Sequence, residues 1–337
     1  MRPRAAGLRA SVVLAAAALL SACGSGATPN AAAPLGPERV AQPATIAARV
    51  THPVALQPDR SPSWMDPAAA KGSLLYISDM VRGRVYAYAY PSGKRAGSLT
   101  GFYQPQGVCA DGNGNVWVVN TGTAQVIEYA HGGTAPIATL DDPNQNPVGC
   151  AIDPKNGNLA VSNLSDIRGG PGSISLYKKA QGTPKLYRSK AFQNLYFLGY
   201  DSAGNLFVDG IAVHKGYFAL GEMAHGSKTI ATVRLSGPTI AFPGGVQSDG
   251  TNMAIGDQVG AVVYQISGTT VESSTPLEKA CIVGQFVISG GKIVAPNLCT
   301  SGNALFYNYP AGGSPTKTLK NLAFPIAATI SSAPQER

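Results

Sequence analysis

The chain has 337 residues, of which 44% are hydrophobic and only 13% charged, with 40 glycines and 25 prolines. Low charge with frequent Gly and Pro is typical of an all-β protein with many short strands, and it excludes a helical enzyme and a generally disordered chain. The formal net charge is +8, but three arginines belong to the N-terminal segment and the other basic residues are scattered, so no nucleic-acid partner is expected.

The first 22 residues have three zones: a basic start, an apolar run from Ala10 to Leu20, and a small-residue ending before Cys23. The run is too short to span a bilayer comfortably, and the order of the zones is that of a secretory signal peptide. Leu20-Ser-Ala-Cys23 resembles a bacterial lipobox, which implies cleavage before Cys23 and acylation of that cysteine. The alternative is an ordinary signal peptide with a nearby cysteine. We expect an exported protein, anchored through acylated Cys23 in the lipid bilayer of the cell membrane or outer membrane.

Residues 23–63 are expected to form a flexible tether. They are rich in Ala, Pro, Gly and Thr and show no sustained hydrophobic period. The alternative is an ordered extension that packs on the globular domain. Residues 64–337 would then form that domain.

A repeat runs through the rest of the chain. Pro105-Gln-Gly-Val-Cys-Ala-Asp111 is followed by Gly114-Asn115 and an apolar strand, and similar stretches recur four times. The recurring glycines are Gly107, Gly149, Gly199, Gly245 and Gly284. Their spacings of 42, 50, 46 and 39 residues match a four-stranded propeller blade. The Asp and Gly-Asn residues predict a hairpin at the start of each repeat.

The first repeat lacks its first strand. Leu74–Asp79, Arg84–Tyr90 and Ala96–Leu99 match the second, third and fourth strands, and the missing strand is found at Phe324–Ile330. A blade assembled from both termini leaves no open sheet edge. We therefore predict an all-β fold, a six-bladed β-propeller whose first blade is closed by the C-terminal strand. A seven-bladed ring is the alternative.

The repeat resembles those of NHL-repeat and gluconolactonase-like six-bladed propellers, over about residues 73–331. The motif specifies a fold and not an activity. In gluconolactonase-like enzymes the resemblance implies Asn, Asp and Glu at the channel mouth, where they hold a divalent metal that polarises a lactone carbonyl. The corresponding positions here are Gln106, Val148, Leu198, Gly244, Val283 and Pro325. Because none is a carboxylate, we expect no metal site and no cofactor, and we assign no catalytic residue.

Four cysteines remain after Cys23, and export would place them in an oxidising compartment. Cys281 and Cys299 lie opposite each other in the hairpin around Gly290-Gly291. Cys109 and Cys150 lie on innermost strands of neighbouring blades and point to opposite faces, as packed blades require. We predict the disulfides Cys109–Cys150 and Cys281–Cys299; buried free thiols are the alternative.

Other polar residues do not gather into a catalytic site. His131 and His225 occupy equivalent rim turns, His52 lies in the tether and His214 in an insertion. One Asp or Asn follows each second strand, at positions Asp79, Asn120, Asn163, Asp209, Asp257 and Asn297. Such a ring could bind a cation, but short Asx side chains that bond nearby backbone are the favoured interpretation.

The sequence thus favours a monomeric, non-catalytic binding or scaffold propeller of the cell envelope. Its ligand would be an unidentified protein, peptide or glycan. The alternative is a metal-dependent, lactonase-like hydrolase or a lyase acting on a small metabolite. Such an enzyme would need a site built by the longer loops at 165–172 or 213–221.

Overall fold

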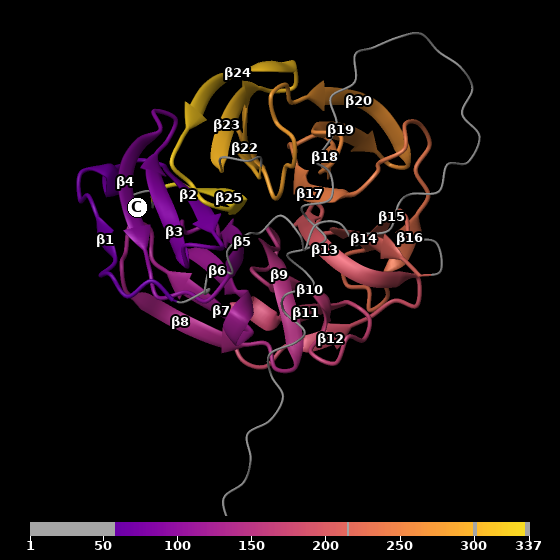
Figure 1. Ribbon diagram of the computed structural model, residues 1–337. Helices are drawn as coiled ribbons and strands as arrows, with labels where there is room; N and C mark the ends of the chain where they lie inside the picture. Colours follow the sequence, from indigo (N-terminus) through magenta and orange to yellow (C-terminus); the bar gives the residue numbers. More distant parts are fainter. Residues whose placement is uncertain (1–57, 214–215, 299–301, 334–337) are drawn as a thin grey trace, which may run out of the picture. The chain divides into compact units, whose positions relative to one another are not determined.

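The computed structural model describes residues 58–213, 216–298 and 302–333. The predicted signal peptide, Cys23 and most of the predicted tether lie outside the described residues. The described residues form six antiparallel sheets arranged as blades around a central axis (Figure 1). The all-β class and the six-bladed propeller are therefore confirmed. Within the described ranges, no helix is long and apolar enough to cross a membrane.

Blades 2 to 6 have four strands each, and in every one of them the strands follow chain order from the axis outward. Blade 2 comprises β5 (Pro105–Ala110), β6 (Val116–Asn120), β7 (Gln125–Tyr129) and β8 (Pro136–Asp141). Blade 3 comprises β9 (Gln145–Ile152), β10 (Leu159–Asp166), β11 (Ser173–Tyr177) and β12 (Lys185–Tyr187). Blade 4 comprises β13 (Phe192–Tyr200), β14 (Leu206–Ala212), β15 (Phe218–Met223) and β16 (Ala231–Val233). The described short 3₁₀ helices are η1 (Ala69–Lys71), η2 (Thr121–Thr123) and η3 (Lys178–Ala180).

The last two full blades follow the same order. Blade 5 comprises β17 (Pro243–Ser248), β18 (Met253–Asp257), β19 (Val262–Ser267) and β20 (Thr270–Pro276). Blade 6 comprises β21 (Val287–Ser289), β22 (Lys292–Asn297), β23 (Asn303–Asn308) and β24 (Gly312–Leu319).

Blade 1 is built from both ends of the domain. It comprises β25 (Pro325–Ser331), β2 (Leu74–Asp79), β3 (Arg84–Ala89), β4 (Lys94–Leu99) and β1 (Trp64–Met65). Closure by the C-terminal strand is confirmed, since Leu75 pairs with Ile330 and Ile77 with Ala328. The structure adds a fifth strand, β1, which pairs with β4. Two residues are too few to show a strand alternation in sequence, so the pattern could not reveal it.

Residues 58–63, which the sequence placed in the tether, also bond to blade 1. The Thr100 hydroxyl donates to the Ser61 carbonyl at 2.6 Å, and the Thr100 amide donates to Ser63 Oγ at 3.0 Å. Asp59 forms an ion pair with Arg84. The contact between the chain and the propeller therefore begins before residue 64.

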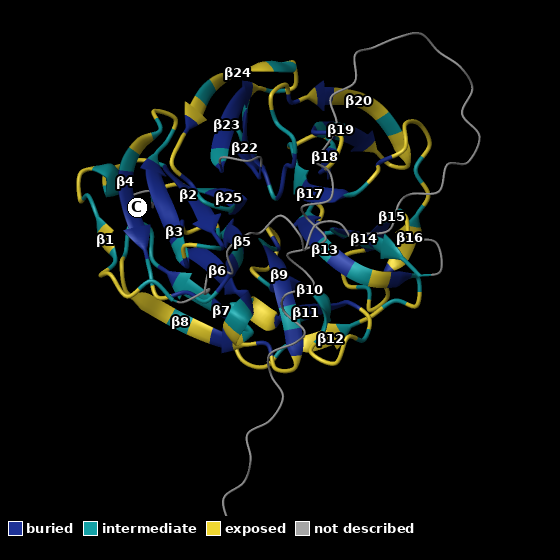
Figure 2. Cartoon of the chain, viewed as in Figure 1, coloured by how far each residue is buried: buried dark blue, intermediate teal, exposed yellow. Residues whose placement is uncertain are grey.

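The core lies between the blades. One cluster of buried side chains fills each of five junctions, such as Trp117, Val119 and Tyr177 between blades 2 and 3. The strands near the axis are mostly buried, whereas the outermost strands β8, β12, β20 and β24 carry most of the exposed residues that lie in strands (Figure 2). Sheet faces packed on one another explain why the strands near the axis are apolar on both sides.

Candidate functional site

The recurring glycines mark where innermost strands of neighbouring blades meet backbone to backbone. A Cβ at Gly107 would lie 2.7 Å from the Cα of Gly149, and one at Gly149 would lie 3.0 Å from the Tyr196 carbonyl oxygen. Equivalent close approaches join Gly199 to Val246 and Gly284 to Ile326. Any larger side chain would push the strands apart, so the repeat glycine is explained by the spacing of the ring.

Serine hydroxyl groups on second strands bond to the innermost strands of the neighbouring blades. Ser78 Oγ of blade 1 donates to the Gln106 carbonyl of blade 2 at 2.5 Å and accepts from the Ala327 amide at 3.1 Å. Ser162 Oγ makes the equivalent bond from blade 3 to the Tyr196 carbonyl of blade 4. Buried carbonyls of the ring thus find partners across blade junctions, as buried backbone requires.

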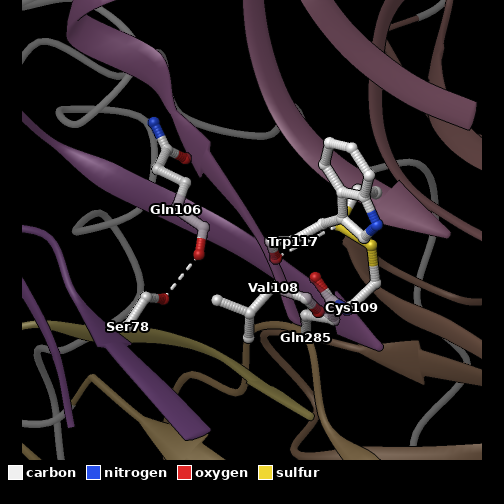
Figure 3. Close-up of a disulfide and its surroundings, with 7 residues drawn as sticks. Ser78, Gln106, Val108, Cys109, Trp117 and Gln285 are labelled. Atoms are coloured by element: carbon white, nitrogen blue, oxygen red, sulfur yellow. Dashed lines mark hydrogen bonds between the residues drawn. A yellow bond between two sulfur atoms is a disulfide. The ribbon is translucent and has the colours of Figure 1, made fainter. Parts of the chain in front are cut away.

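A disulfide joins blades 2 and 3 at the axis. It links Cys109 of β5 to Cys150 of β9, with a Cα–Cα distance of 5.7 Å, and this is the pair that the strand faces predicted. In Figure 3 the indole of Trp117 lies beside it. Cys281 is disulfide-bonded too, but Cys299, its predicted partner, lies outside the described residues.

A cavity of about 390 Å³ opens on the axis at the end where the innermost strands finish. All six blades contribute to its wall. Examples of lining residues, one from each blade in the order 1 to 6, are Thr329, Ala110, Ile152, Tyr200, Gln247 and Gln285. The Cys109–Cys150 disulfide also lies in the wall. The volume falls in the range of small-molecule sites, and the position is where the ring brings separate strands together.

Two glutamine side chains shape this cavity. Gln285 Nε2 donates to the Val108 carbonyl at 2.8 Å, which ties blade 6 to blade 2 across the closing strand (Figure 3). The Gln285 Oε1 atom is buried and has no hydrogen-bond partner among the described residues. Gln247 uses both ends of its amide on the backbone of Ile288, at 2.9 and 3.1 Å. A buried acceptor without a donor is costly, so Gln285 Oε1 is a ready partner for a ligand donor.

The cavity wall is nearly uncharged. Among the described residues that line it, none is Lys, Arg or His, and Asp201 is the one carboxylate. Asp201 Oδ1 accepts the amides of Ala203 and Asn205 at 2.9 and 2.8 Å, so it shapes a turn. The remaining polar groups are amides and hydroxyls. This wall suits a neutral ligand that offers hydrogen-bond donors and some apolar surface.

The six predicted mouth positions lie mostly away from this cavity, near the start of the innermost strands. Leu198 lines the cavity wall and is 3% exposed. Val148 and Val283 are 5% and 2% exposed, and Gly244 and Pro325 are buried. Gln106 is half-buried, and its amide points away from the disulfide (Figure 3). Whether any of the six contacts a ligand stays a prediction.

Sequence reasoning missed Gln285, Gln247 and Thr329. One signal was present: Gln285 directly follows Gly284, whereas the repeat glycines of blades 2 to 5 are followed by Val, Cys or Tyr. The cavity itself could not be found, because its wall depends on which ends of six strands converge.

The ring of Asp and Asn residues bonds to protein groups. Asp257 accepts the Ala241 amide at 2.9 Å, and Asn120 accepts the Tyr103 amide at 2.7 Å. Asp209 accepts the amides of Phe197 and Gly244, from the innermost strands of blades 4 and 5. Burial raises the pKa of Asp209 to about 8, against the lowering effect of these bonds. The interpretation of these side chains as backbone caps is supported at these positions.

A second buried carboxyl lies where the chain crosses from blade 2 to blade 3. Asp142 Oδ1 accepts the Ser175 hydroxyl at 2.6 Å, and Asn163 Nδ2 donates to the same hydroxyl at 2.8 Å. Burial raises the pKa of Asp142 to about 6, while the Ser175 and Asn163 hydrogen bonds lower it. Asp142 Oδ2 and Asn163 Oδ1 are buried, and no described residue provides either atom with a hydrogen-bond partner.

The histidines do not converge on the cavity. His131 bonds to the Ser331 hydroxyl at 2.6 Å and to the Ala70 carbonyl at 2.9 Å, so it ties a rim turn to both ends of blade 1. His225 lies near Gly204, and His52 and His214 fall outside the described residues. No group of three or more His, Cys, Asp or Glu that could hold a metal occurs among the described residues.

The fold and site define a six-bladed propeller with an NHL repeat. The NHL-repeat family model matches residues 102–129, which include β5, β6 and β7 of blade 2. A solved propeller in a nidogen/laminin complex is 11% identical with a TM-score of 0.64, over 78% of this chain and 99% of that chain. A protein of unknown function from Bacteroides caccae is also 11% identical, with a TM-score of 0.58 over 77% and 99%. No curated protein matches. At these identities the structural likeness shows the fold alone.

Proposed function

We propose that this chain is a lipid-anchored binding propeller of the cell envelope that holds a neutral, hydrogen-bonding ligand in the axial cavity. The observation that carries the proposal is the cavity of about 390 Å³, to which all six blades contribute and whose wall is nearly uncharged. A preformed concave site with a few placed polar groups is typical of ligand binding. Gln285 Oε1 and the Thr329 hydroxyl would receive ligand donors.

Ligand binding can be tested with a panel of neutral saccharides and short uncharged peptides, detected by saturation-transfer NMR. Ser202 is exposed and lies at the cavity wall, so Ser202→Trp would obstruct the cavity without disturbing the core. Ser227→Trp makes the same change at a half-buried position of a turn that does not line the cavity. Loss of the signal in Ser202→Trp, with retention in Ser227→Trp, supports the site. Signals that survive in both variants, or no signal from any probe, contradict it.

The anchor rests on the lipobox-like Leu20-Ser-Ala-Cys23 sequence. Metabolic labelling with a palmitate analogue in a bacterial host should label the full chain, and Cys23→Ser should abolish the label. The expected mature mass corresponds to a chain that begins at residue 23. A labelled Cys23→Ser variant, or an unlabelled parent chain, would remove the anchor from the proposal and leave the cavity untouched.

A further inference from the structure

Charge is divided unevenly between the blades. Residues 58–100 and 279–335, which supply blades 1 and 6 and the closing strand, contain ten basic and three acidic residues. Residues 101–278, which supply blades 2 to 5, contain ten basic and thirteen acidic residues. One of the three acids, Asp79, is buried and bonds to backbone amides. The excess positive charge therefore lies on two neighbouring blades.

The cations of these two blades meet along one outer edge. Lys317 of β24 donates to the carbonyls of Pro91 and Ser92 in the β3–β4 turn, at 3.1 and 2.5 Å, beside the exposed Lys94. Arg82 in the β2–β3 turn donates to the Asn321 carbonyl, next to the exposed Lys320. Both turns of blade 1 thus contact blade 6 and the loop that follows it. We call this surface the basic edge, and its members are Arg82, Arg84, Lys94, Arg95, Lys317 and Lys320.

Three guanidinium groups of the basic edge gather on one tyrosine. The Arg95 and Arg84 guanidinium carbons lie 3.9 and 5.6 Å from the Tyr86 ring centroid, and Arg82 Nη1 donates to the Tyr86 hydroxyl at 2.9 Å. Arg84 pairs with Asp59, whereas Arg82 and Arg95 form no ion pair with the described residues. The aromatic ring fixes the guanidinium groups in place but leaves their charge uncompensated, which favours an anionic partner.

The first described residues, N-terminal to which the predicted lipid anchor lies, contact this edge. Asp59 and Ser61 contact Arg84, and 34 residues separate Pro58 from Cys23. A stretch of this length reaches up to about 120 Å when extended, so it cannot set the orientation of the propeller by itself. A charged surface can do so, because an anionic leaflet contributes about 1 kcal/mol for each Lys or Arg close to it.

We propose that the basic edge binds the headgroups of anionic phospholipids and holds the propeller with blades 1 and 6 toward the membrane. This inference rests on the proposed function for the presence of a membrane nearby, and it assigns the surface that faces that membrane. The cavity on the axis then stays free of the bilayer, because the edge lies on β3, β4, β24 and the loops beside them, and none of its members lines the cavity.

The test uses the mature chain with Cys23→Ser, so that acylation contributes nothing. Its binding to vesicles of phosphatidylcholine, with and without phosphatidylglycerol, is measured by sedimentation at low and high salt. We expect binding to the phosphatidylglycerol vesicles that weakens with salt. Lys94→Gln/Lys317→Gln/Lys320→Gln should lower the partition coefficient at least about tenfold. Lys94→Gln/Lys320→Gln, which keeps the Lys317 bonds, guards against a folding defect and should show a smaller loss.

The control variant Lys178→Gln/Lys179→Gln/Lys185→Gln removes three charges from blade 3 and should bind like the parent. An equal loss of vesicle binding in both triple variants would mean that binding depends on net charge alone, and it would overturn the proposal. Equal binding to both kinds of vesicle would overturn it too. Tighter binding of a single-stranded oligonucleotide at equal phosphate concentration would assign the edge to a nucleic acid instead. None of these outcomes depends on the acylation or cavity experiments.

Discussion

The junction between blades 2 and 3 and the junction between blades 6 and 1 are built on different chemistry. The first is joined covalently by Cys109–Cys150. The second is joined by a parallel bridge between Gln285 and Ala327, whose hydrogen bonds measure 2.9 Å. Blade 1, on one side of this junction, is assembled from distant segments, because its innermost strand β25 pairs with β2. Backbone pairing thus closes the ring in the one blade whose first two strands are not joined by a turn.

Among changes at the two junctions, deletion of β25 should have the largest effect on the stability of the fold. A chain that stops at Phe324 loses a seven-residue strand whose side chains are mostly buried. The lost burial and backbone pairing approach the whole stability of a typical domain, about 5–15 kcal/mol. We expect no cooperative thermal transition by circular dichroism. A chain that stops at Ala333 is the matched control and should melt like the parent; a cooperative melt without β25 would refute closure as a requirement.

Removal of the Cys109–Cys150 disulfide should lower the free energy of unfolding less than deletion of β25 does. Cys109→Ala/Cys150→Ala deletes a cross-link over a sequence separation of 41, and such a loss typically lowers the free energy of unfolding by about 2–4 kcal/mol. Urea denaturation under oxidising conditions measures the difference, with the ring still folded in the variant. Added reductant should narrow the gap between variant and parent. An unchanged midpoint would show that the disulfide is dispensable at this junction.

The buried carboxyl at the same junction predicts a pH dependence. Burial raises the pKa of Asp142 to about 6, so the folded protein holds this proton more tightly than the unfolded chain. The contribution of this group to stability is largest below about pH 4 and is lost as the pH rises to about 6. Asp142→Asn keeps an acceptor for Ser175 and removes the charge. It should raise the free energy of unfolding by roughly 1–3 kcal/mol at pH 7 and change it little at about pH 4. A gain of equal size at both pH values would exclude this cause.

The smallest expected effect compares a hydroxyl that bonds to the closing strand with one that does not. Ser78 donates to the Gln106 carbonyl of blade 2 and accepts from the Ala327 amide of β25, whereas Ser162 donates one bond, to the Tyr196 carbonyl of blade 4. Ser78→Ala should therefore cost about 1–3 kcal/mol and Ser162→Ala about 1 kcal/mol. Guanidinium denaturation of the two variants beside the parent measures the order. The reverse order would mean that the closing seam depends less on this hydroxyl than its geometry indicates.

The repeat made much of the fold predictable. Glycine spacing gave the blade size, Phe324–Ile330 matched the missing first strand, and the opposite faces of Cys109 and Cys150 indicated a pair that the structure joins. These features are local or periodic in the sequence, so a single sequence is enough to reveal them. The residues of the candidate site are neither close together nor periodic in the sequence. Gln285 reaches Val108 across an intervening strand, and no pattern around either residue encodes that distance.

The basic edge illustrates the same limit. Its cations come from residues 82–95 and 317–320, which are far apart in the sequence, so the cations look scattered there. Ring closure brings the two segments together, as the bonds from Lys317 to Pro91 and from Arg82 to Asn321 show. Charge clustering that depends on a contact over more than 200 positions is invisible until the topology is known.

Closure by β25 also bears on the order in which the fold forms. Leu75 cannot pair with Ile330 until residue 330 has been synthesised and, in a chain exported as proposed, has crossed the membrane. Before that moment the edge of β2 stays open, and the ring has no complete blade 1. For a chain exported as proposed, late closure keeps the polypeptide unfolded enough to thread through a translocation channel. The last residues to arrive would complete the fold on the far side of the membrane.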